Sequence, residues 1–436
     1  MRIAIAGGGY AGMAAAVTAS DAGAEVTVFE AAATLGGRAR RVDHRELALD
    51  NGLHILVGAY TETLRLIEHV TREPAVRRLL RTPLDLRIDG CVRLRRPATP
   101  LPPPLHLAAT LLLGRGLSIR DKLAAARLMQ GLARMRFSPP PAMTVSGLLD
   151  TLAQPPSVKR VLWEPLCIAA LNTAPAIACA RTFAATLRDT LAGPATASDL
   201  LLPTTDLTEL FPGPAARYLA SRGATIRLRS RVEAITMNGS SACLTAGGVR
   251  ESFDRIVVAL PPHRAGALLR AIPALRPAAE QLDSLRYEPI HSIYLRYAEP
   301  VRLEAPMLGF TNGTVQWLFD REALCGQTGL LGVVISASSA HLTLPQEALA
   351  ARVDAELRER IGPLPRLSWH RVIAEKRATF SCRPMLERHG TRTGVPGVFL
   401  AGDHVASEYP ATLEAAIRSG VRAGTLAMEP ASRAES

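Results

Sequence analysis

Three glycines near the N-terminus have the spacing of a loop that binds a dinucleotide. Gly7, Gly9 and Gly12 form a G-x-G-x-x-G motif between a short apolar run and a predicted helix at residues 10–22. In such a loop the first glycine makes the tight turn, the second admits a pyrophosphate, and the third lets the helix pack on the strand. The first helical turn, which includes Ala11, favours phosphate because its N–H groups are free and the helix dipole is positive there.

A carboxylate completes this first motif. Glu30 lies 18 residues beyond Gly12, at the end of a second predicted strand over residues 25–29. A carboxylate at that place can accept hydrogen bonds from an adenosine ribose. Because a strand, a helix and an acid all stand at the required spacing, the sequence favours a nucleotide-binding site over an ordinary glycine-rich turn.

Two further segments favour FAD over a nicotinamide cofactor. Gly37 and Arg38 follow Glu30, and a small residue with a guanidinium there can close over the pyrophosphate and pair with its charge. The ribityl chain and flavin ring of FAD extend beyond the first motif and require a second binding segment. A nicotinamide cofactor does not need such a segment from the C-terminal part of the chain.

The C-terminal part of the chain offers such a segment. Gly402 and Asp403 follow a predicted apolar strand at residues 397–401, and a helix begins near Thr412 and Leu413. The Asp403 carboxylate can accept hydrogen bonds from a polyol chain, while the N-terminus of that helix faces the flavin.

These motifs resemble those of the flavin-containing amine oxidoreductase and phytoene desaturase superfamily. Over residues 1–428 the chain also resembles one family within it, the squalene-associated FAD-dependent enzymes, or hydroxysqualene dehydroxylases, of bacterial hopanoid pathways. The segments that carry this second resemblance are residues 50–56 (DNGLHIL), 162–167 (LWEPLC), 170–173 (ALNT), 198–203 (SDLLLP), 210–219 (LFPGPAARYL) and 409–414 (YPATLE). One departure is Ala415, where the family usually has glycine.

The resemblance implies an α/β fold: a Rossmann-like FAD-binding domain of the amine oxidoreductase type, with an inserted α+β substrate domain and helical segments. We expect the FAD-binding domain to be discontinuous, over residues 1–59, 216–284 and 376–436. The substrate domain is then expected over residues 60–215 and 285–375.

The implied reaction is the reductive removal of the hydroxyl of hydroxysqualene, a hydrophobic C30 isoprenoid, to give squalene. The resemblance also implies that the backbone at Val232 reaches the adenine. The sequence has no second G-x-G-x-x-G motif, so we expect an external electron donor to reduce the flavin.

Two residues in the family segments are candidates for proton chemistry. His54 follows the D-x-G motif that passes close to the flavin in this superfamily, and it is either an acid–base group or a structural histidine bonded to backbone. Glu164 lies in an apolar stretch, where a raised pKa would suit a general acid. The alternative for Glu164 is a carboxylate at a helix start or in an ion pair. Asn172 either binds a substrate hydroxyl or caps a helix.

Lys376 and Cys382 are candidates suggested by amine oxidases. A lysine that holds a water near the flavin occurs in that class, and Lys376 or Arg377 matches it, with the other cation at the surface. Cys382 lies loosely where some amine oxidases bind FAD covalently, but the surrounding residues lack the rest of that motif. We therefore expect non-covalent FAD.

Three other functions remain open at this stage. A carotenoid or phytoene-type desaturase would use the same fold in the opposite redox direction. A flavin amine oxidase usually has two facing aromatic rings at the flavin, and near the last motif only Tyr409 is available. A flavin-free assembly protein for isoprenoid synthases is disfavoured, because the motifs provide contacts for pyrophosphate, ribose and ribityl groups.

The composition bears on partners. The chain has 51 basic and 39 acidic residues, a net charge of +12, and six cysteines without a C-x-x-C pair, which argues against a zinc ribbon or a disulfide framework. A basic surface attracts polyanions, and in the absence of any nucleic-acid recognition motif we favour an anionic membrane over nucleic acid.

A membrane-facing region is predicted over residues 97–137. It joins a proline-broken apolar segment to an amphipathic helix at 117–137, with Arg120, Arg127 and Arg134 on one face and Leu117, Ala125, Leu128, Leu132 and Met135 on another. No apolar run reaches the ~18–20 residues that a spanning helix needs. We expect a cytoplasmic protein associated peripherally with the inner face of the membrane; the alternative is an ordinary surface helix.

Overall fold

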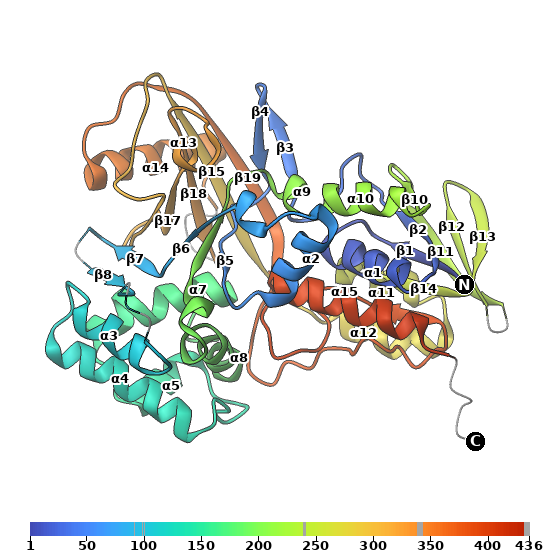
Figure 1. Cartoon of the computed structure of the whole chain (residues 1–436), viewed down its shortest axis with the longest axis horizontal. Coiled ribbons are helices and arrows are strands. Elements are labelled where there is room, and N and C mark those ends of the chain that lie inside the picture. The colour runs from blue at the N-terminus through green and yellow to red at the C-terminus, as the bar shows by residue number, and fades with distance from the viewer. Residues whose placement is uncertain (91, 98, 100, 239–240, 338–342, 431–436) are drawn as a thin grey trace.

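The N-terminal residues form the strand–helix–strand unit that the glycine motif predicts. The computed structural model describes residues 1–90, 92–97, 99, 101–238, 241–337 and 343–430. The unit consists of β1 (Arg2–Ala6), α1 (Tyr10–Asp21) and β2 (Glu25–Phe29), and it lies on the right in Figure 1. All but the first residue of each strand are buried, as expected for a parallel sheet covered on both faces.

The central sheet of this unit is assembled from distant parts of the chain. Its five parallel strands run in the order β10-β2-β1-β14-β20. The later strands are β10 (Thr225–Arg227), β14 (Arg255–Val258) and β20 (Val398–Leu400). The C-terminal segment therefore does return to the N-terminal sheet.

Helices and a small sheet cover the two faces of the five-stranded sheet. Ile3 and Ile5 point into a core shared with α1 and α15 (Leu413–Met428), whereas Ala4 and Ala6 point into a core on the opposite face. That opposite core is completed by β11 (Val232–Asn238), β12 (Ser241–Ala246), β13 (Val249–Phe253), α11 (Pro262–Leu269) and α12 (Arg276–Asp283).

A mixed seven-stranded sheet forms the second unit, at the upper left of Figure 1. Its order is β19-β15-β18-β17-β16-β7-β8. The bounds are β7 (Asp85–Ile88), β8 (Val92–Arg95), β15 (Tyr287–Tyr297), β16 (Met307–Gly309), β17 (Trp317–Asp320), β18 (Leu330–Ser336) and β19 (Leu367–Phe380). Helix α14 (Gln346–Ile361) packs on one face through Leu349, Val353 and Leu357.

The other face of this sheet packs against a helical region, at the lower left of Figure 1. Leu128 and Leu132 of this region share one apolar cluster with Trp317 and Phe319 of the sheet. The helices are α3 (Leu105–Leu113), α4 (Ile119–Arg134), α5 (Val145–Thr151), α6 (Pro156–Val158), α7 (Glu164–Leu171) and α8 (Ala180–Leu187).

Short elements connect the two units. A hairpin is made by β3 (Arg41–His44) and β4 (Leu47–Asp50), and a small sheet by β5 (Leu56–Val57), β9 (Leu200–Pro203) and β6 (Leu79–Thr82). The helices among them are α2 (Thr61–Thr71), α9 (Leu207–Leu210), α10 (Pro212–Ser221) and α13 (Arg321–Cys325).

Two of the predicted domain boundaries are misplaced, because they fall inside regular elements. The boundary at residues 215 and 216 cuts α10, and the boundary at 375 and 376 cuts the 14-residue strand β19. Helices α2 and α10 pack with α1, and their Leu66 and Leu219 belong to the core of the first unit. That contact joins residues far apart in sequence, so local patterns did not reveal it.

Candidate active site

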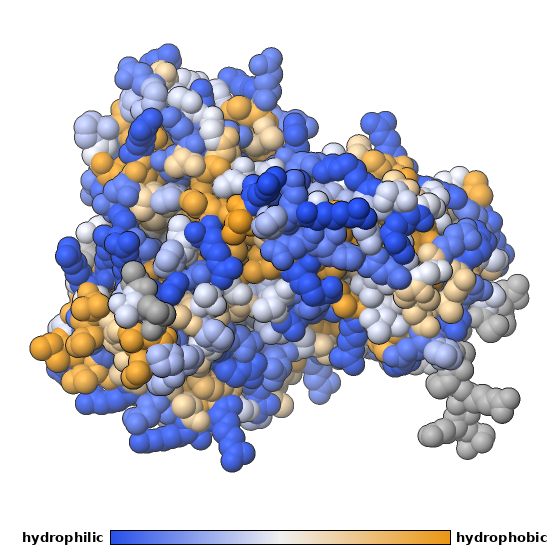
Figure 2. All heavy atoms as spheres, in the orientation of Figure 1, coloured by the Kyte–Doolittle hydropathy of each residue, from blue (hydrophilic) through white to orange (hydrophobic). Residues whose placement is uncertain are grey.

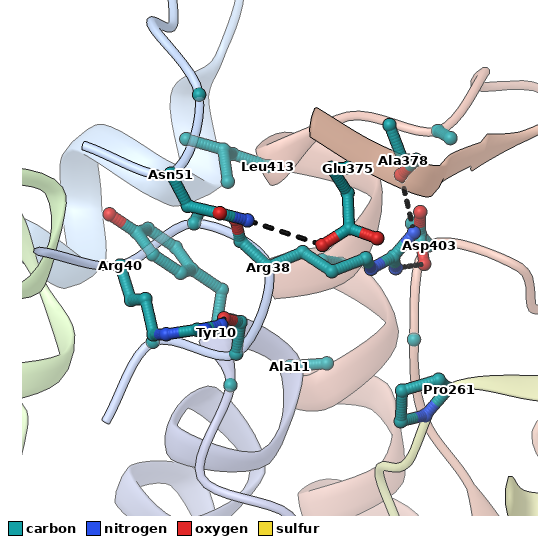
Figure 3. A pocket seen from close by; sticks show the side chains of 18 of the residues that line it. Tyr10, Ala11, Arg38, Arg40, Asn51, Pro261, Glu375, Ala378, Asp403 and Leu413 are labelled. Atoms are coloured by element: carbon teal, nitrogen blue, oxygen red, sulfur yellow. Dashed lines mark hydrogen bonds and ion pairs between the residues drawn. The ribbon is translucent and has the colours of Figure 1, made fainter. Parts of the chain in front are cut away.

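A cavity of about 810 Å³ lies between the two units. Its polar part is lined by the residues that follow β1, β2, β14 and β20 and by the first turns of α1 and α15, as Figure 3 shows from close by. Its apolar part is lined by side chains from β15, β17 and β18. In open α/β sheets, ligands bind at this carboxyl end of the parallel strands.

The three motif glycines shape the floor of the cavity differently. A Cβ atom added at Gly7 would lie 2.4 Å from the carbonyl oxygen of Ala259, and one at Gly12 would lie 1.9 Å from the carbonyl oxygen of Gly7. One added at Gly9 would meet no atom closer than the Cα of Gly37, at 3.8 Å. The first two positions therefore exclude any side chain, while Gly9 leaves free the space into which a ligand can come close.

Glu30 lies at the edge of the cavity, at the end of β2. Its carboxylate accepts hydrogen bonds from the backbone N–H groups of Gly8 and Ala32, each at 2.7 Å. A carboxylate has about four acceptor sites, so two bonds leave capacity for a ribose hydroxyl. Glu30 thus also holds the glycine loop, a role that the motif alone does not reveal.

Arg38, which is partly exposed, forms an ion pair with the buried Asp403. Its Nη2 lies 2.5 Å from Asp403 Oδ1, and its Nη1 donates to the carbonyl oxygen of Ala378 at 2.6 Å (Figure 3). Burial on its own would raise the pKa of Asp403, but Arg38 and His404 outweigh it and hold that pKa well below its usual range. Asp403 is therefore ionised, and contact of Arg38 with a pyrophosphate stays a prediction.

His404 provides a test of whether a polar ligand fits this cavity. It lines the cavity and is buried, yet neither ring nitrogen has a hydrogen-bond partner among the described residues. Its Nδ1 lies 3.7 Å from Asp403 Oδ1, beyond hydrogen-bond distance. Buried polar groups are normally satisfied, so an unpaired imidazole here, with the open space at Gly9, fits a cavity that holds a polar cofactor such as FAD.

The C-terminal helix begins at the cavity wall. Thr412 caps α15, with its Oγ1 accepting from the N–H of Ala415 at 3.1 Å, and Leu413 is the first helical residue. Both line the cavity, as does Val232 at the start of β11 on the side of Glu30 and Arg231. The structure therefore gathers every predicted cofactor-binding residue except Gly12 into the lining, and Gly12 lies beneath it against Gly7.

His54 is the one predicted catalytic residue that lines this cavity. Its Nδ1 lies 2.7 Å from the carbonyl oxygen of Gly52, which can only accept, so Nδ1 carries the proton and Nε2 is an acceptor. Burial and the nearby Arg38 lower the pKa of His54, although the bond to Gly52 opposes them. The histidine is therefore neutral near pH 7.

Glu164 and Lys376 lie elsewhere. Glu164 lines a second cavity of about 450 Å³, which it shares with Arg160 and Arg352. Lys376 and Arg377 are exposed, and neither belongs to the lining of the first cavity. Their neighbour Glu375 lines the first cavity instead, so a catalytic role of Lys376 stays a prediction that its position does not support.

Asn51, Glu375 and Asn172 also line the cavity. The sequence did not assign Asn51 or Glu375 to the site, and it left Asn172 between two roles. Asn51 donates from Nδ2 to Glu375 Oε2 at 3.2 Å, which joins the end of β4 to β19 (Figure 3). Asn172 is the left-handed C-cap of α7, and its amide bonds to Thr379 Oγ1 at 2.9 Å and to the N–H of Ala337. The family segments contained Asn51 and Asn172, but the sequence did not indicate their partners.

Cys382 and Tyr409 do not line the cavity. Cys382 is buried in the apolar cluster beneath β19, and burial raises the pKa of its thiol to about 11. Tyr409 donates to Asp189 at 2.9 Å, with Arg418 stacked over its ring. The geometry thus gives no support to a covalent flavin at Cys382 or to an aromatic cage at Tyr409.

The fold and the cavity define a flavin-dependent oxidoreductase, and sequence comparison agrees. A family model described as flavin containing amine oxidoreductase matches residues 10–427, so the chain belongs to that family. Among its relatives is the hydroxysqualene dehydroxylase of Rhodopseudomonas palustris, 30% identical over 97% of each chain. The hydroxysqualene dehydroxylase of Zymomonas mobilis is 26% identical over 97% of this chain and 98% of the relative.

More distant relatives share the same architecture. The zeta-carotene desaturase of Arabidopsis thaliana is 22% identical over 98% of this chain and 85% of its own. Cyclohexylamine oxidase from Brevibacterium oxydans superposes with a TM-score of 0.70 at 19% identity, covering 98% of both chains. The predicted fold class, the FAD cofactor and the oxidoreductase class are confirmed.

Proposed function

We propose that this FAD-dependent enzyme removes the hydroxyl of hydroxysqualene reductively and so produces squalene. The observation that carries the proposal is similarity over nearly the whole length to three proteins named hydroxysqualene dehydroxylase, at 26–30% identity over 97% of this chain. Zeta-carotene desaturases also match over nearly the whole chain, but at 22–23% identity.

The apolar part of the cavity suits a hydrocarbon. Ile290, Trp317, Phe319 and Val334 line it from β15, β17 and β18, and Leu53 lines it from the segment after β4. Apolar walls exclude water from the reacting carbon and strengthen each charge interaction in the site. Reduced FAD, when bound, would supply the hydride that replaces the leaving hydroxyl. The hydroxyl leaves as water and so also takes up one proton, which balances the oxidation of FADH2 to FAD.

The side chains of the polar part are suited to guide the hydroxyl and its charge. Neutral His54 can accept a hydrogen bond from the substrate hydroxyl at Nε2, and so position that hydroxyl. Because the imidazole is neutral, Nε2 carries no proton to donate. Glu375 places a carboxylate in the lining, held by Asn51 and by the N–H of Arg377 at 3.2 Å. Positive charge develops on the allylic carbon as the hydroxyl leaves, and a fixed carboxylate stabilises such charge.

The decisive experiment is an anaerobic assay of the FAD-loaded enzyme with hydroxysqualene. Chemical reduction of the flavin by dithionite replaces the external electron donor, which we propose to be a separate redox protein or a reduced small molecule. We expect squalene to appear together with reoxidation of the flavin absorbance. Reoxidation without squalene, or no turnover at all, contradicts the proposal.

A desaturase is the second candidate, because the zeta-carotene desaturases share the full length of the fold. It would bind FAD in the same cavity and dehydrogenate a polyene precursor. Anaerobic incubation of the oxidised enzyme with zeta-carotene, without dithionite, distinguishes the two. New conjugated absorbance in that reaction, with hydroxysqualene left unchanged, favours the desaturase.

A further inference from the structure

Large apolar side chains are exposed together on α3 and the start of α4. Leu105, Leu112, Leu113, Ile119 and Leu123 are each 52–77% exposed, and they are half of the large hydrophobic residues exposed among the described residues. Figure 2 shows them as a hydrophobic area at the lower left, where α3 lies in Figure 1. We name these five residues the α3–α4 surface. Contiguous exposed apolar patches mark interaction sites.

This surface is not the apolar arc that the sequence predicted. Ala125, Leu128 and Leu132 of that arc are fully buried against the cluster beneath the seven-stranded sheet, as the alternative of an ordinary surface helix expects. The arc is buried because the neighbouring helices present apolar side chains to it. Ile119 and Leu123 lie on a different side of α4 and remain uncovered.

The two helices hold the surface in a fixed shape. Lys122 donates from Nζ to the carbonyl oxygen of Leu112 at 2.7 Å, which ties α4 to the end of α3. The turn between them is fixed to β8, since Arg115 and Arg93 exchange backbone hydrogen bonds at 2.9 and 3.1 Å. The exposed leucines are therefore presented by ordered backbone.

The exposed charges on α3, α4 and the turn between them are of one sign. Arg115, Arg120 and Arg127 are exposed. Asp121 is the one acidic residue between positions 101 and 134, and it is buried, where it accepts hydrogen bonds from Ser118 and Ser157. Apolar side chains beside exposed arginines match a bilayer with anionic headgroups.

We propose that the α3–α4 surface docks on an anionic lipid bilayer. Leu112, Leu113 and Ile119 enter the boundary between headgroups and acyl chains, and Arg115 and Arg120 bind lipid phosphates. Bilayers of this charge occur at the cytoplasmic face of the cell membrane. Within the described residues no helix has the length and hydrophobicity to cross a bilayer, so the contact is peripheral.

The docking surface is connected to the cavity wall. Leu111 of α3 is buried in the same apolar cluster as Trp317 and Phe319, which line the cavity. The docking inference itself rests on the surface and its charge, and it holds whichever substrate the enzyme uses.

Cosedimentation of the FAD-loaded protein with vesicles tests the proposal. We use vesicles of pure phosphatidylcholine and vesicles with about one-third phosphatidylglycerol. The wild type should bind the anionic vesicles, and binding should weaken in high salt because the Debye length falls from about 10 Å at 0.1 M to 3 Å at 1 M. The triple variant Leu112→Gln/Leu113→Gln/Ile119→Gln should lose at least tenfold in partition coefficient.

A matched control separates this surface from hydrophobicity in general. Val76 and Val249 are exposed to 57% and 58% on other parts of the molecule, so Val76→Gln/Val249→Gln should bind vesicles as the wild type does. The double variant Arg115→Gln/Arg120→Gln should lose the preference for anionic vesicles. Each variant should keep the wild-type flavin spectrum, which shows that the cofactor domain is intact.

Two results would overturn the proposal. One is equal vesicle binding by the triple variant and the wild type. The other is a wild type that binds no vesicles but forms dimers by sedimentation velocity, with the triple variant monomeric, since the surface would then bind a second copy of the chain. The hydroxysqualene assay can be run in detergent, without a bilayer. A protein that does not dock on vesicles can therefore still be tested for the proposed reaction, and the two failures are distinguished.

Discussion

Gly420 of α15 lies directly against the backbone of Ala11 in α1. A Cβ atom added at Gly420 would be 2.1 Å from the Ala11 carbonyl oxygen, and one added at Gly424 would be 2.7 Å from that of Ala15. From the first contact to the second, the residue number rises by four in each helix, so the two helices run parallel. Both N-termini therefore point toward the cavity and line it, with α15 beginning further from this contact than α1.

The first prediction concerns this contact. Gly420→Ala should force the two helices apart, since backbone cannot yield to a 2.1 Å contact, and this should outweigh the gain of ~1 kcal/mol in helix propensity. We expect a lower melting temperature and weaker FAD retention. Gly390→Ala is the control, because a Cβ atom there would have no neighbour within 4 Å. Equal effects of the two substitutions would contradict the helix-contact explanation.

The second prediction concerns the ribose contact. Glu30→Ala removes a charge-assisted bond worth about 1.5–3 kcal/mol, which corresponds to a 10- to 150-fold loss of FAD affinity. It also releases the N–H groups of Gly8 and Ala32. Titration of the apoprotein with FAD, followed by quenching of flavin fluorescence, gives the affinity. An unchanged dissociation constant would show that Glu30 holds only the loop.

The third prediction concerns the Arg38–Asp403 pair. The pKa of Asp403 is depressed in the folded protein, so its stabilising effect is present above the unfolded pKa of ~4 and is lost as the pH falls through the folded pKa. Arg38→Gln leaves only His404 to oppose the effect of burial, so the pKa of Asp403 should rise. Release of FAD on acidification should therefore begin at a higher pH than in the wild type, whereas Arg377→Gln, an exposed cation, should leave the release profile unchanged.

The fourth prediction concerns Asp50, which is buried beside Arg321 at 3.6 Å and accepts from the N–H of Leu207 at 2.8 Å. Burial raises the pKa of Asp50 to about 7, although Arg321 opposes it. Its contribution to stability is thus full below pH ~4 and is lost as the pH rises through about 7.

Urea unfolding of the wild type and of Asp50→Asn across this range measures the effect. The wild type should lose stability relative to the variant as the pH rises, with a slope of up to ~1.4 kcal/mol per pH unit. A stability difference that is independent of pH would mean that Asp50 is ionised throughout.

The fifth prediction places the charge-stabilising carboxylate at Glu375. Glu375→Gln should lower kcat for squalene formation by ~10²-fold, by analogy with the removal of one preorganised electrostatic group, while FAD binding stays intact. Glu164→Gln and Lys376→Gln, at residues outside this cavity, should keep rates close to the wild type. The opposite ranking would restore the sequence-based candidates.

Local patterns predicted the cofactor-binding part of the site well. The strand, helix and turn around Gly7 and Gly12, the strand before Gly402 and the helix after Thr412 all depend on neighbours in sequence, and the structure contains each of them. Their meeting at one cavity follows from the rule that parallel strands end at a common edge.

The catalytic part could not be predicted in this way. The contact between Asn51 and Glu375 joins residues 324 positions apart. Glu375 is paired with Ile290 of β15, whereas Lys376 lies in the register shift that follows, and no local pattern showed either. The exposed side of α4 likewise depended on which neighbours cover Leu128. Such choices are made by tertiary packing, and an isolated sequence window does not contain them.

Strand β19 has a mechanical consequence. It lies at the edge of the seven-stranded sheet, and it carries Glu375, Ala378 and Thr379 into the cavity wall. Its pairing with β15 shifts register between Glu375 and Thr379, where three residues of β19 stand opposite Pro289. This bulge lies in the cavity wall, so any bending of β19 at that point changes the part of the wall that faces the flavin.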